Sequence, residues 1–305
     1  MDGSPRFGPE AREIDLIEIA QADTGEPIGQ VDTAKGDAVI IRADGETVVA
    51  EAGTAIFLGD VVETSGDGAI GLVFVDDTAF SLAEVGRMTI DEMIYDPVNN
   101  EGSSVFNVAK GVFTFVSGEI AKTSVDAMQI ETSVATIGIR GTAGGGRVIN
   151  PQADDPNSPL SPSGTFSNFR DPVTGQAGEM NISTPTGTQT LNGINATTTV
   201  PNPFVPPSTP VVLPGSALQA VFGSSIAALP TPPSQQDAGE GEDGQDVGES
   251  LTQGDAPEEG DARAEAETAA ADAFARALAD GVDPVAALAI AAQTAELTIS
   301  RFGID

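Results

Sequence analysis

The stretch DAMQIETSVATIGIRGTAGGG, Asp126 to Gly146, joins a β-rich phrase to a glycine-dense end. Within it Ile137 and Ile139 alternate with Gly138, which predicts a strand with both isoleucines on one face. Arg140 then lies on the opposite face, and we interpret the glycines that follow as a flexible turn. The stretch therefore predicts a core-facing strand that ends in a turn.

The chain upstream of this stretch repeats the β pattern at short intervals. Runs of β-branched residues alternate with glycine and aspartate, and Ala43-Asp44-Gly45 is typical of a hairpin turn. The expected strands are Ala38 to Arg42, Thr47 to Ala50, Val61 to Thr64, Ile70 to Val75, Met88 to Ile90, Val105 to Val108, Val112 to Val116 and Met128 to Thr132. Such short, frequent strands predict a mainly β fold, a compact antiparallel sandwich or roll.

Phenylalanines indicate where the core lies. Phe113 and Phe115 alternate with smaller residues, so both are expected on the buried face of one strand. By the same reasoning Phe74, Phe80 and Phe106 are core candidates.

Composition excludes several classes of function. The formal net charge of -33 and the pI near 4.1 disfavour nucleic acid and anionic lipid as partners. The chain contains no histidine, cysteine or tryptophan, which removes the commonest general base, thiol nucleophiles and the usual zinc ligands. Enzymes that use two carboxylates or a Ser/Lys pair stay possible, but no spacing indicates either. We expect no enzyme activity, cofactor or metal centre.

Three phrases carry a family resemblance. They are Gly59-Asp60-Val61-Val62-Glu63-Thr64, Val75-Asp76-Asp77-Thr78, and Ala135-Thr136-Ile137-Gly138-Ile139-Arg140-Gly141-Thr142. Their order and spacing resemble the FecR domain, over roughly residues 31–148. The resemblance implies a module outside the cytoplasmic membrane, either in sigma-factor regulators or near the start of large secreted surface proteins.

The chain looks more like the second group. No segment approaches the roughly 20 apolar residues of a membrane-spanning helix, and the first thirty residues lack the pattern of a cleavable signal. The resemblance implies an extracytoplasmic location, in the periplasm, at the cell surface or secreted, with type I secretion, which needs no cleavable N-terminal signal, as the candidate route.

Composition shifts divide the chain into six segments. They are a polar leader (1–30), a FecR-like β domain (31–149), its loop and β-hairpin extension (150–200), a Pro-rich connector and short helix (201–229), a disordered acidic linker (230–261) and an Ala-rich α-helical hairpin (262–300). In the connector, Ser216 is expected to cap a helix that ends at Ala228 and carries Leu218, Val221 and Phe222 at helical spacing. The hairpin could pack on a copy of itself, so an oligomer is possible.

The candidate interaction or structural motif is Thr136, Ile137, Gly138, Ile139, Arg140, Gly141 and Thr142. Arg140 either forms an ion pair that pins the turn, which we favour, or accepts an acidic group of a partner. The glycines 144–146 resemble an anion nest, but no helix start follows them, so a phosphate loop is disfavoured.

The leading interpretation is a non-enzymatic protein-interaction or signalling module of the bacterial envelope or cell surface, whose edge strands could accept a partner strand. One alternative is a calcium-responsive secreted surface or adhesin-type protein, with Ca²⁺ bound by the acidic stretches. Another is a carboxylate-based glycan hydrolase, which predicts a cleft with two close acids and a shifted pKa.

Overall fold

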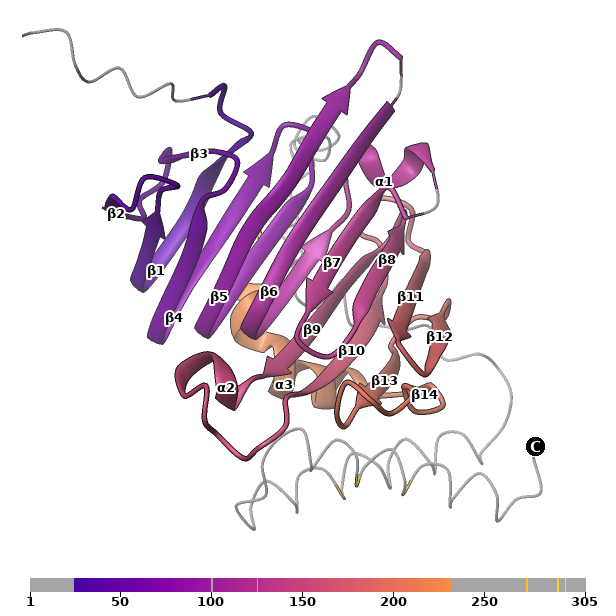
Figure 1. Cartoon of the computed structure of the whole chain (residues 1–305). Helices are drawn as coiled ribbons and strands as arrows, with labels where there is room; N and C mark the ends of the chain where they lie inside the picture. The colour runs from indigo at the N-terminus through magenta and orange to yellow at the C-terminus, as the bar shows by residue number, and fades with distance from the viewer. Residues whose placement is uncertain are drawn as a thin grey trace, which may run out of the picture.

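A computed structural model describes residues 25–99, 101–124 and 126–231, together with residues 273, 290 and 294. The acidic linker apart from its first two residues, and the helical hairpin apart from those three residues, lie outside the described residues. So does most of the expected polar leader. The expected mainly β fold is confirmed, because the described strands all join in one sheet (Figure 1).

The strands are β1 (Gly29–Ile41), β2 (Thr47–Val49), β3 (Ala55–Ile56), β4 (Val61–Phe74), β5 (Ala79–Asp96), β6 (Glu101–Val116), β7 (Met128–Thr132), β8 (Thr136–Arg140), β9 (Ala143–Ile149), β10 (Ser163–Phe169), β11 (Glu179–Thr184), β12 (Gly187–Leu191), β13 (Ala196–Val200) and β14 (Val211–Val212). The helices are α1 (Ile120–Thr123), α2 (Pro151–Asp154) and α3 (Gly215–Ala228).

The expectation of uniformly short strands was wrong for the first part of the sheet. β4, β5 and β6 are 14, 18 and 16 residues long, and each unites two of the expected strands or extends one of them. The glycines between the runs do not end the strands. They form β-bulges inside them, at Gly36 (φ +64°) in β1, Gly66 (φ +58°) in β4 and Gly111 (φ +111°) in β6.

The bulges lie at one level across the sheet. The register shifts between Lys35 and Asp37 in β1, between Glu63 and Ala69 in β4, and between Ala83 and Arg87 in β5. A Cβ added to Gly111 would lie 2.5 Å from Cα of Gly86, so the bulges of β5 and β6 touch. Because a bulge bends its strand and increases the local twist, this aligned row contributes to the curvature of the sheet.

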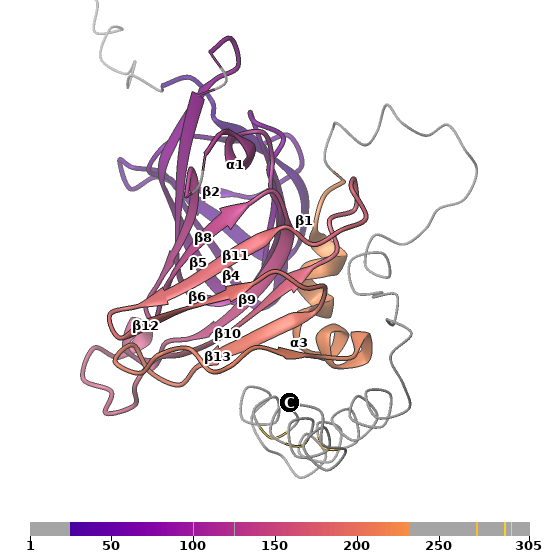
Figure 2. The same ribbon diagram turned by 90° about the vertical axis from the view of Figure 1, so that its right-hand side faces the viewer.

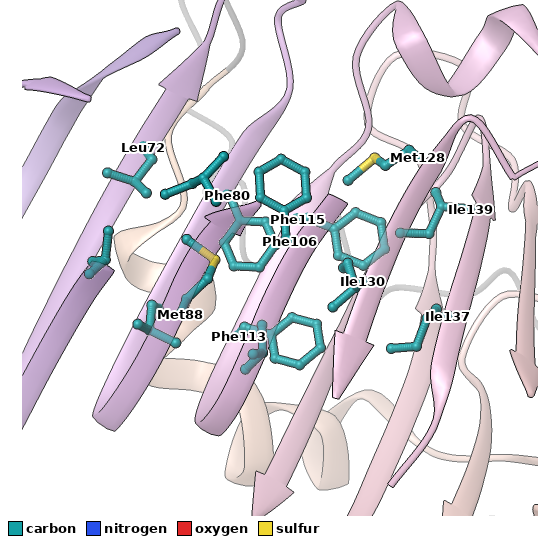
Figure 3. Close-up of a cluster of buried hydrophobic side chains, with 14 of the residues drawn as sticks. Leu72, Phe80, Met88, Phe106, Phe113, Phe115, Met128, Ile130, Ile137 and Ile139 are labelled. Atoms are coloured by element: carbon teal, nitrogen blue, oxygen red, sulfur yellow. The ribbon is translucent and has the colours of Figure 1, made fainter. Parts of the chain in front are cut away.

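The main core lies on one face of the sheet, on both sides of the bulge row. Residues on both sides of each bulge face the same cluster, as Phe106 and Phe113 of β6 do. Even-numbered residues face the core before Gly111 and odd-numbered residues face it afterwards, because the bulge at Gly111 adds one residue to the alternation. The five phenylalanines expected in the core are all buried, and Phe80, Phe106, Phe113 and Phe115 stack near the isoleucines of β7 and β8 (Figure 3).

At β6 the sheet divides into two wings, which we call the β7 wing and the β9 wing. The first part of β6 pairs in parallel with β7, and the wing continues through β8 and β11 to β12. The last part of β6 pairs with β9, and that wing continues through β10 and β13 to β14. α1 lies in the connection between β6 and β7 and buries Ile120 in the main core, at the upper end of the roll in Figure 2.

Helix α3 covers the outer face of the sheet over β5 and β6, and it also contacts β4 and β9 (Figure 2). A cross-strand row of small residues under it, which includes Gly71, Ser81 and Thr114, lets the helix approach closely. Ser81 Oγ donates to the Ser225 carbonyl at 2.7 Å. The expected end at Ala228 is confirmed, but Ser216 is not the cap, because the helix begins at Gly215 with Pro214 at the N-cap and no side-chain cap bond.

Candidate interaction site

The motif Thr136 to Thr142 lies in and just after β8, between β7 and β11. Ile137 and Ile139 are buried in the main core and Arg140 is exposed on the opposite face, as the alternation predicts. Gly138 leaves room for a neighbour, since an added Cβ would lie 2.1 Å from Oδ1 of Asp126. The outer face of β8 is thus formed by Thr136, Gly138 and Arg140.

Arg140 does not pin the turn through an ion pair. Glu179 is its cross-strand neighbour on β11, yet no carboxylate of the described part of the chain lies within 4.0 Å of the Arg140 guanidinium. The favoured interpretation of Arg140 was therefore wrong. A role for Arg140 in partner binding stays a prediction.

Thr142 holds the turn instead. Its N–H donates to Ser117 Oγ at 2.9 Å, and its Oγ1 lies 2.6 Å from Oδ1 of Asn168, to which it donates. The Gly178 N–H donates to the same Thr142 Oγ1 at 3.0 Å. Asn168 Nδ2 then donates to the carbonyls of Gly178 and Leu191, each at 3.0 Å.

The two side chains at the centre of this network are buried. Thr142 and Asn168 each have 0% of their surface exposed, so the hydrogen bonds are made away from competing water. They tie β9 and β10 to the segments that flank the β11–β12 hairpin. The network therefore connects the two wings of the sheet.

The glycines 144–146 do not form a flexible turn or an anion nest. They lie inside β9, which pairs with β6 on one side and β10 on the other. A Cβ on Gly146 would lie 2.4 Å from Cζ of Phe113, and one on Gly144 would lie 2.6 Å from Sδ of Met180. Glycine is required here because large core side chains occupy the space over the strand.

The phrase Gly59 to Thr64 contains a buried ion pair. Asp60 is 1% exposed and pairs with Arg42, whose Nη1 also donates to the Ala55 carbonyl at 2.9 Å. The Phe57 N–H donates to Asp60 at 2.8 Å, and the Arg42 guanidinium lies 5.0 Å from the centre of the Phe57 ring. These contacts fasten the loop before β4 to the end of β1.

Replacing Arg42 by methionine should cost about 3–5 kcal/mol of unfolding free energy, because the buried Asp60 carboxylate is left without its cation. Urea denaturation at neutral pH measures the loss. The matched control is Arg87→Met, which breaks the exposed Arg87–Glu63 pair and should cost under about 1 kcal/mol. Equal losses in the two variants would contradict the structural role of the Arg42–Asp60 pair.

The phrase Val75 to Thr78 forms the tight turn between β4 and β5. Asp76 is 1% exposed, and its carboxylate accepts bonds from the Thr78 N–H at 3.1 Å, the Thr78 hydroxyl at 2.8 Å and the Ile120 N–H at 3.3 Å. Burial raises the pKa of Asp76, and the bonds from Thr78 and Ile120 offset part of that rise. Both oxygens are occupied by groups of the protein, so Asp76 is not an open acid of the kind that a glycan hydrolase needs.

The titration of Asp76 is open to direct measurement. The folded-state pKa lies above the usual 3.8, so the contribution of Asp76 to stability is fully present below the unfolded pKa and is lost as pH rises through the folded pKa. Carboxyl ¹³C NMR should give a midpoint above 3.8 for Asp76 and a still higher one in Thr78→Val, which removes a bond to the carboxylate. Asp96, whose pKa is lowered by bonds from Asn99, should titrate below 3.8 in the same spectra; the reverse order would contradict the assignment.

No group of three metal-ligating side chains suited to hold an ion occurs in the described residues. The acidic stretch to which calcium binding was attributed lies outside them. Among the described helices, none has both the length and the hydropathy needed to cross a membrane.

Strand β12, which the sequence motifs did not single out, is an edge of the sheet. It ends the strand order on the side of the β7 wing, and on its outer side it pairs with no described strand. Its residues Gly187-Thr188-Gln189-Thr190-Leu191 contain no charge and no proline. Its threonine-rich alternation was a visible signal, but sequence alone does not show which strand becomes an edge.

Comparisons with known proteins assign no family to the chain. No family model and no curated protein matches it. Among solved structures, a cell surface anchoring domain is 28% identical over 21% of this chain and 83% of that chain, with a TM-score of 0.20. Two crystal structures of a candidate anti-sigma factor from Parabacteroides distasonis ATCC 8503 are 11% identical over 48% of this chain and 57% of that chain, with a TM-score of 0.35. The chain is thus similar over limited segments to a surface-anchoring domain and to a candidate anti-sigma factor.

Proposed function

We propose that this chain is a non-enzymatic protein-interaction and signalling module that acts outside the cytoplasmic membrane, and that it binds by accepting an extended strand at β12. The FecR-like phrases support the location and the class. In the described residues two of them, around Asp60 and Asp76, fasten loops and turns, and the third continues into the buried Thr142 network. They thus build a scaffold, which leaves binding to the surface.

The observation that carries the proposal is the contrast between β12 and the other ends of the sheet. β2 has three residues and is flanked by Glu46 and Glu51, and β14 has two residues between Pro210 and Pro214. Short length, charge and proline are the usual protections of an edge strand. β12 has five residues, which include no charge and no proline, and the nearest proline, Pro185, lies in the turn before it.

The backbone of β12 presents a defined set of bonding groups. Thr184 and Gly187 flank a two-residue turn, so these two residues form backbone hydrogen bonds with each other. Hydrogen-bonded pairs alternate along an antiparallel hairpin, so Ile182–Gln189 and Met180–Leu191 are also hydrogen-bonded pairs. The N–H and C=O groups of Thr188 and Thr190 therefore point away from β11. A partner strand that pairs with these two residues extends the sheet in the manner of β-augmentation.

Replacing Thr188 by proline should abolish partner binding and leave the fold intact, because the lost N–H points outward and makes no bond to β11. A photo-crosslinking residue at position 190 of the full chain, expressed in native cells, reports the contact. We expect an adduct in the envelope or secreted fraction that disappears with Thr188→Pro and persists with Thr188→Val, which keeps the N–H.

Two outcomes would contradict the proposal. The first is native protein found solely in the cytoplasm. The second is an adduct that is equally strong when the crosslinking residue is placed at the exposed Val49 of β2, at the opposite end of the strand order.

A further inference from the structure

We infer that the strand accepted at β12 is β12 of a second copy of this chain, so that two copies join their sheets across a twofold axis. This inference rests on the proposed function and names the partner at the same site. It is carried by the distribution of charge over the fold and by the register that the edge permits.

Charge is distributed very unevenly along the described chain. Residues 25–131 contain nineteen acidic and five basic residues. Residues 132–231 contain the acidic residues Asp154, Asp155, Asp171 and Glu179 against the basic residues Arg140, Arg147 and Arg170. The second half is thus close to neutral, although the whole chain has a net charge of -33.

Among the described residues, this asymmetry favours a contact between copies through β12 over one through β2. β12 lies at one end of the strand order and the acid-flanked β2 lies at the other. Pairing through β12 places the acidic ends farthest apart and brings the near-neutral ends together, where screening by salt over about 8–10 Å suppresses the remaining repulsion. A contact through β2 would instead juxtapose Glu46 and Glu51 with their copies.

The sequence of β12 is compatible with antiparallel self-pairing. With the twofold axis at Gln189, Thr188 of one copy lies opposite Thr190 of the other, and both residues point their backbone groups outward. The two such pairs then exchange four backbone hydrogen bonds. Cross-strand threonine pairs are favourable in sheets, and no charged side chain of β12 opposes its copy.

The loop before β14 approaches the start of β12 and contains an exposed phenylalanine. Pro206 is close to the start of β12, since a Cβ on Gly187 would lie 3.0 Å from Cβ of Pro206. Phe204, two residues earlier, is 77% exposed. A five-residue edge with one aromatic neighbour is small beside the roughly 1,000 Å² of a stable interface, so the dimer is expected to be weak and concentration-dependent.

The absence of cysteine from the chain allows a test by single-cysteine crosslinking of the full-length protein. Gln189→Cys should form a disulfide-linked dimer under mild oxidation, because residue 189 faces itself in a non-hydrogen-bonded pair with Cα atoms about 4.5 Å apart. Thr190→Cys alone should not crosslink, since diagonal neighbours are about 7–8 Å apart. A mixture of Thr188→Cys and Thr190→Cys should crosslink. Val49→Cys on β2 is the matched control for random collision.

Sedimentation of the cysteine-free protein provides the second arm. A monomer–dimer equilibrium that is lost with Thr188→Pro and kept with Thr188→Val supports the inference. A monomer at all concentrations, or a Val49→Cys dimer that forms as fast as the Gln189→Cys dimer, overturns it. If a crosslinker at position 190 then captures a different protein in native cells, the proposed function stands and the second copy is not the partner.

Discussion

Replacing Asn168 by aspartate should destabilise the protein by at least about 3 kcal/mol at neutral pH, although the two side chains have nearly the same shape. Asn168 Nδ2 donates to the carbonyls of Gly178 and Leu191 at 3.0 Å. Aspartate puts a buried negative oxygen against those two acceptors, and each unsatisfied or repelled buried group costs about 1–3 kcal/mol, or more when charged.

The loss should depend on pH, and urea denaturation at several pH values measures it. The introduced carboxyl is favoured in its neutral form by burial, so its folded pKa lies above the unfolded value. The destabilisation relative to the parent protein should therefore be smallest below about pH 4 and grow as pH rises. Asn157→Asp, at an exposed position, is the control and should change stability by under about 0.5 kcal/mol. A small, pH-independent loss in Asn168→Asp would show that the Thr142–Asn168 network does not hold the wings together.

Replacing Gly146 by valine should prevent the protein from folding into a soluble state. The first added carbon would already lie 2.4 Å from Cζ of Phe113 and 2.8 Å from Cδ1 of Phe166, and both rings are fully buried. Overpacking a dense core costs about 1–3 kcal/mol when neighbours can shift, and here each neighbour is held by its own stacking partners or strand.

Soluble yield and the near-ultraviolet circular dichroism of any soluble fraction measure the effect. Gly193→Ala is the matched control, because its nearest neighbour, Cβ of Ala196, lies 3.8 Å from an added Cβ. Combining Gly146→Ala with Phe113→Leu should restore part of the stability that Gly146→Ala alone removes. A folded, fully stable Gly146→Val variant would contradict the placement of β9 against the core.

The alternation of apolar residues in the sequence predicted correctly which side chains are buried, but the positions of glycine predicted the strand ends poorly. The alternation in Ile137-Gly138-Ile139 and in the Phe113 and Phe115 strand identified core side chains correctly. Glycine was the source of the errors, because one residue type serves three physical roles in this chain. Gly45 ends a strand in a turn, Gly111 bends one without ending it, and Gly146 stays extended under a ring.

The functional surface was less accessible to sequence reasoning for a related reason. Whether a threonine-rich strand such as β12 becomes an edge or an interior strand depends on where the rest of the chain pairs. Arg140 showed the same limitation, since its nearest cross-strand acid, Glu179, comes from a strand far along the chain. The location outside the cytoplasm, the absence of catalysis and the interaction role stay predictions.

The aligned bulges of β1, β4, β5 and β6 also bear on aggregation. Strands of 14 to 18 residues rich in valine, isoleucine and phenylalanine would be hazardous if straight, because amyloid fibrils stack straight segments in register. The register shifts at the bulge row interrupt each strand, so a straight strand cannot pair along its whole length, and neighbouring strands match only when their bulges coincide. The glycines that shape the core therefore also act as a safeguard against misassembly while the chain folds.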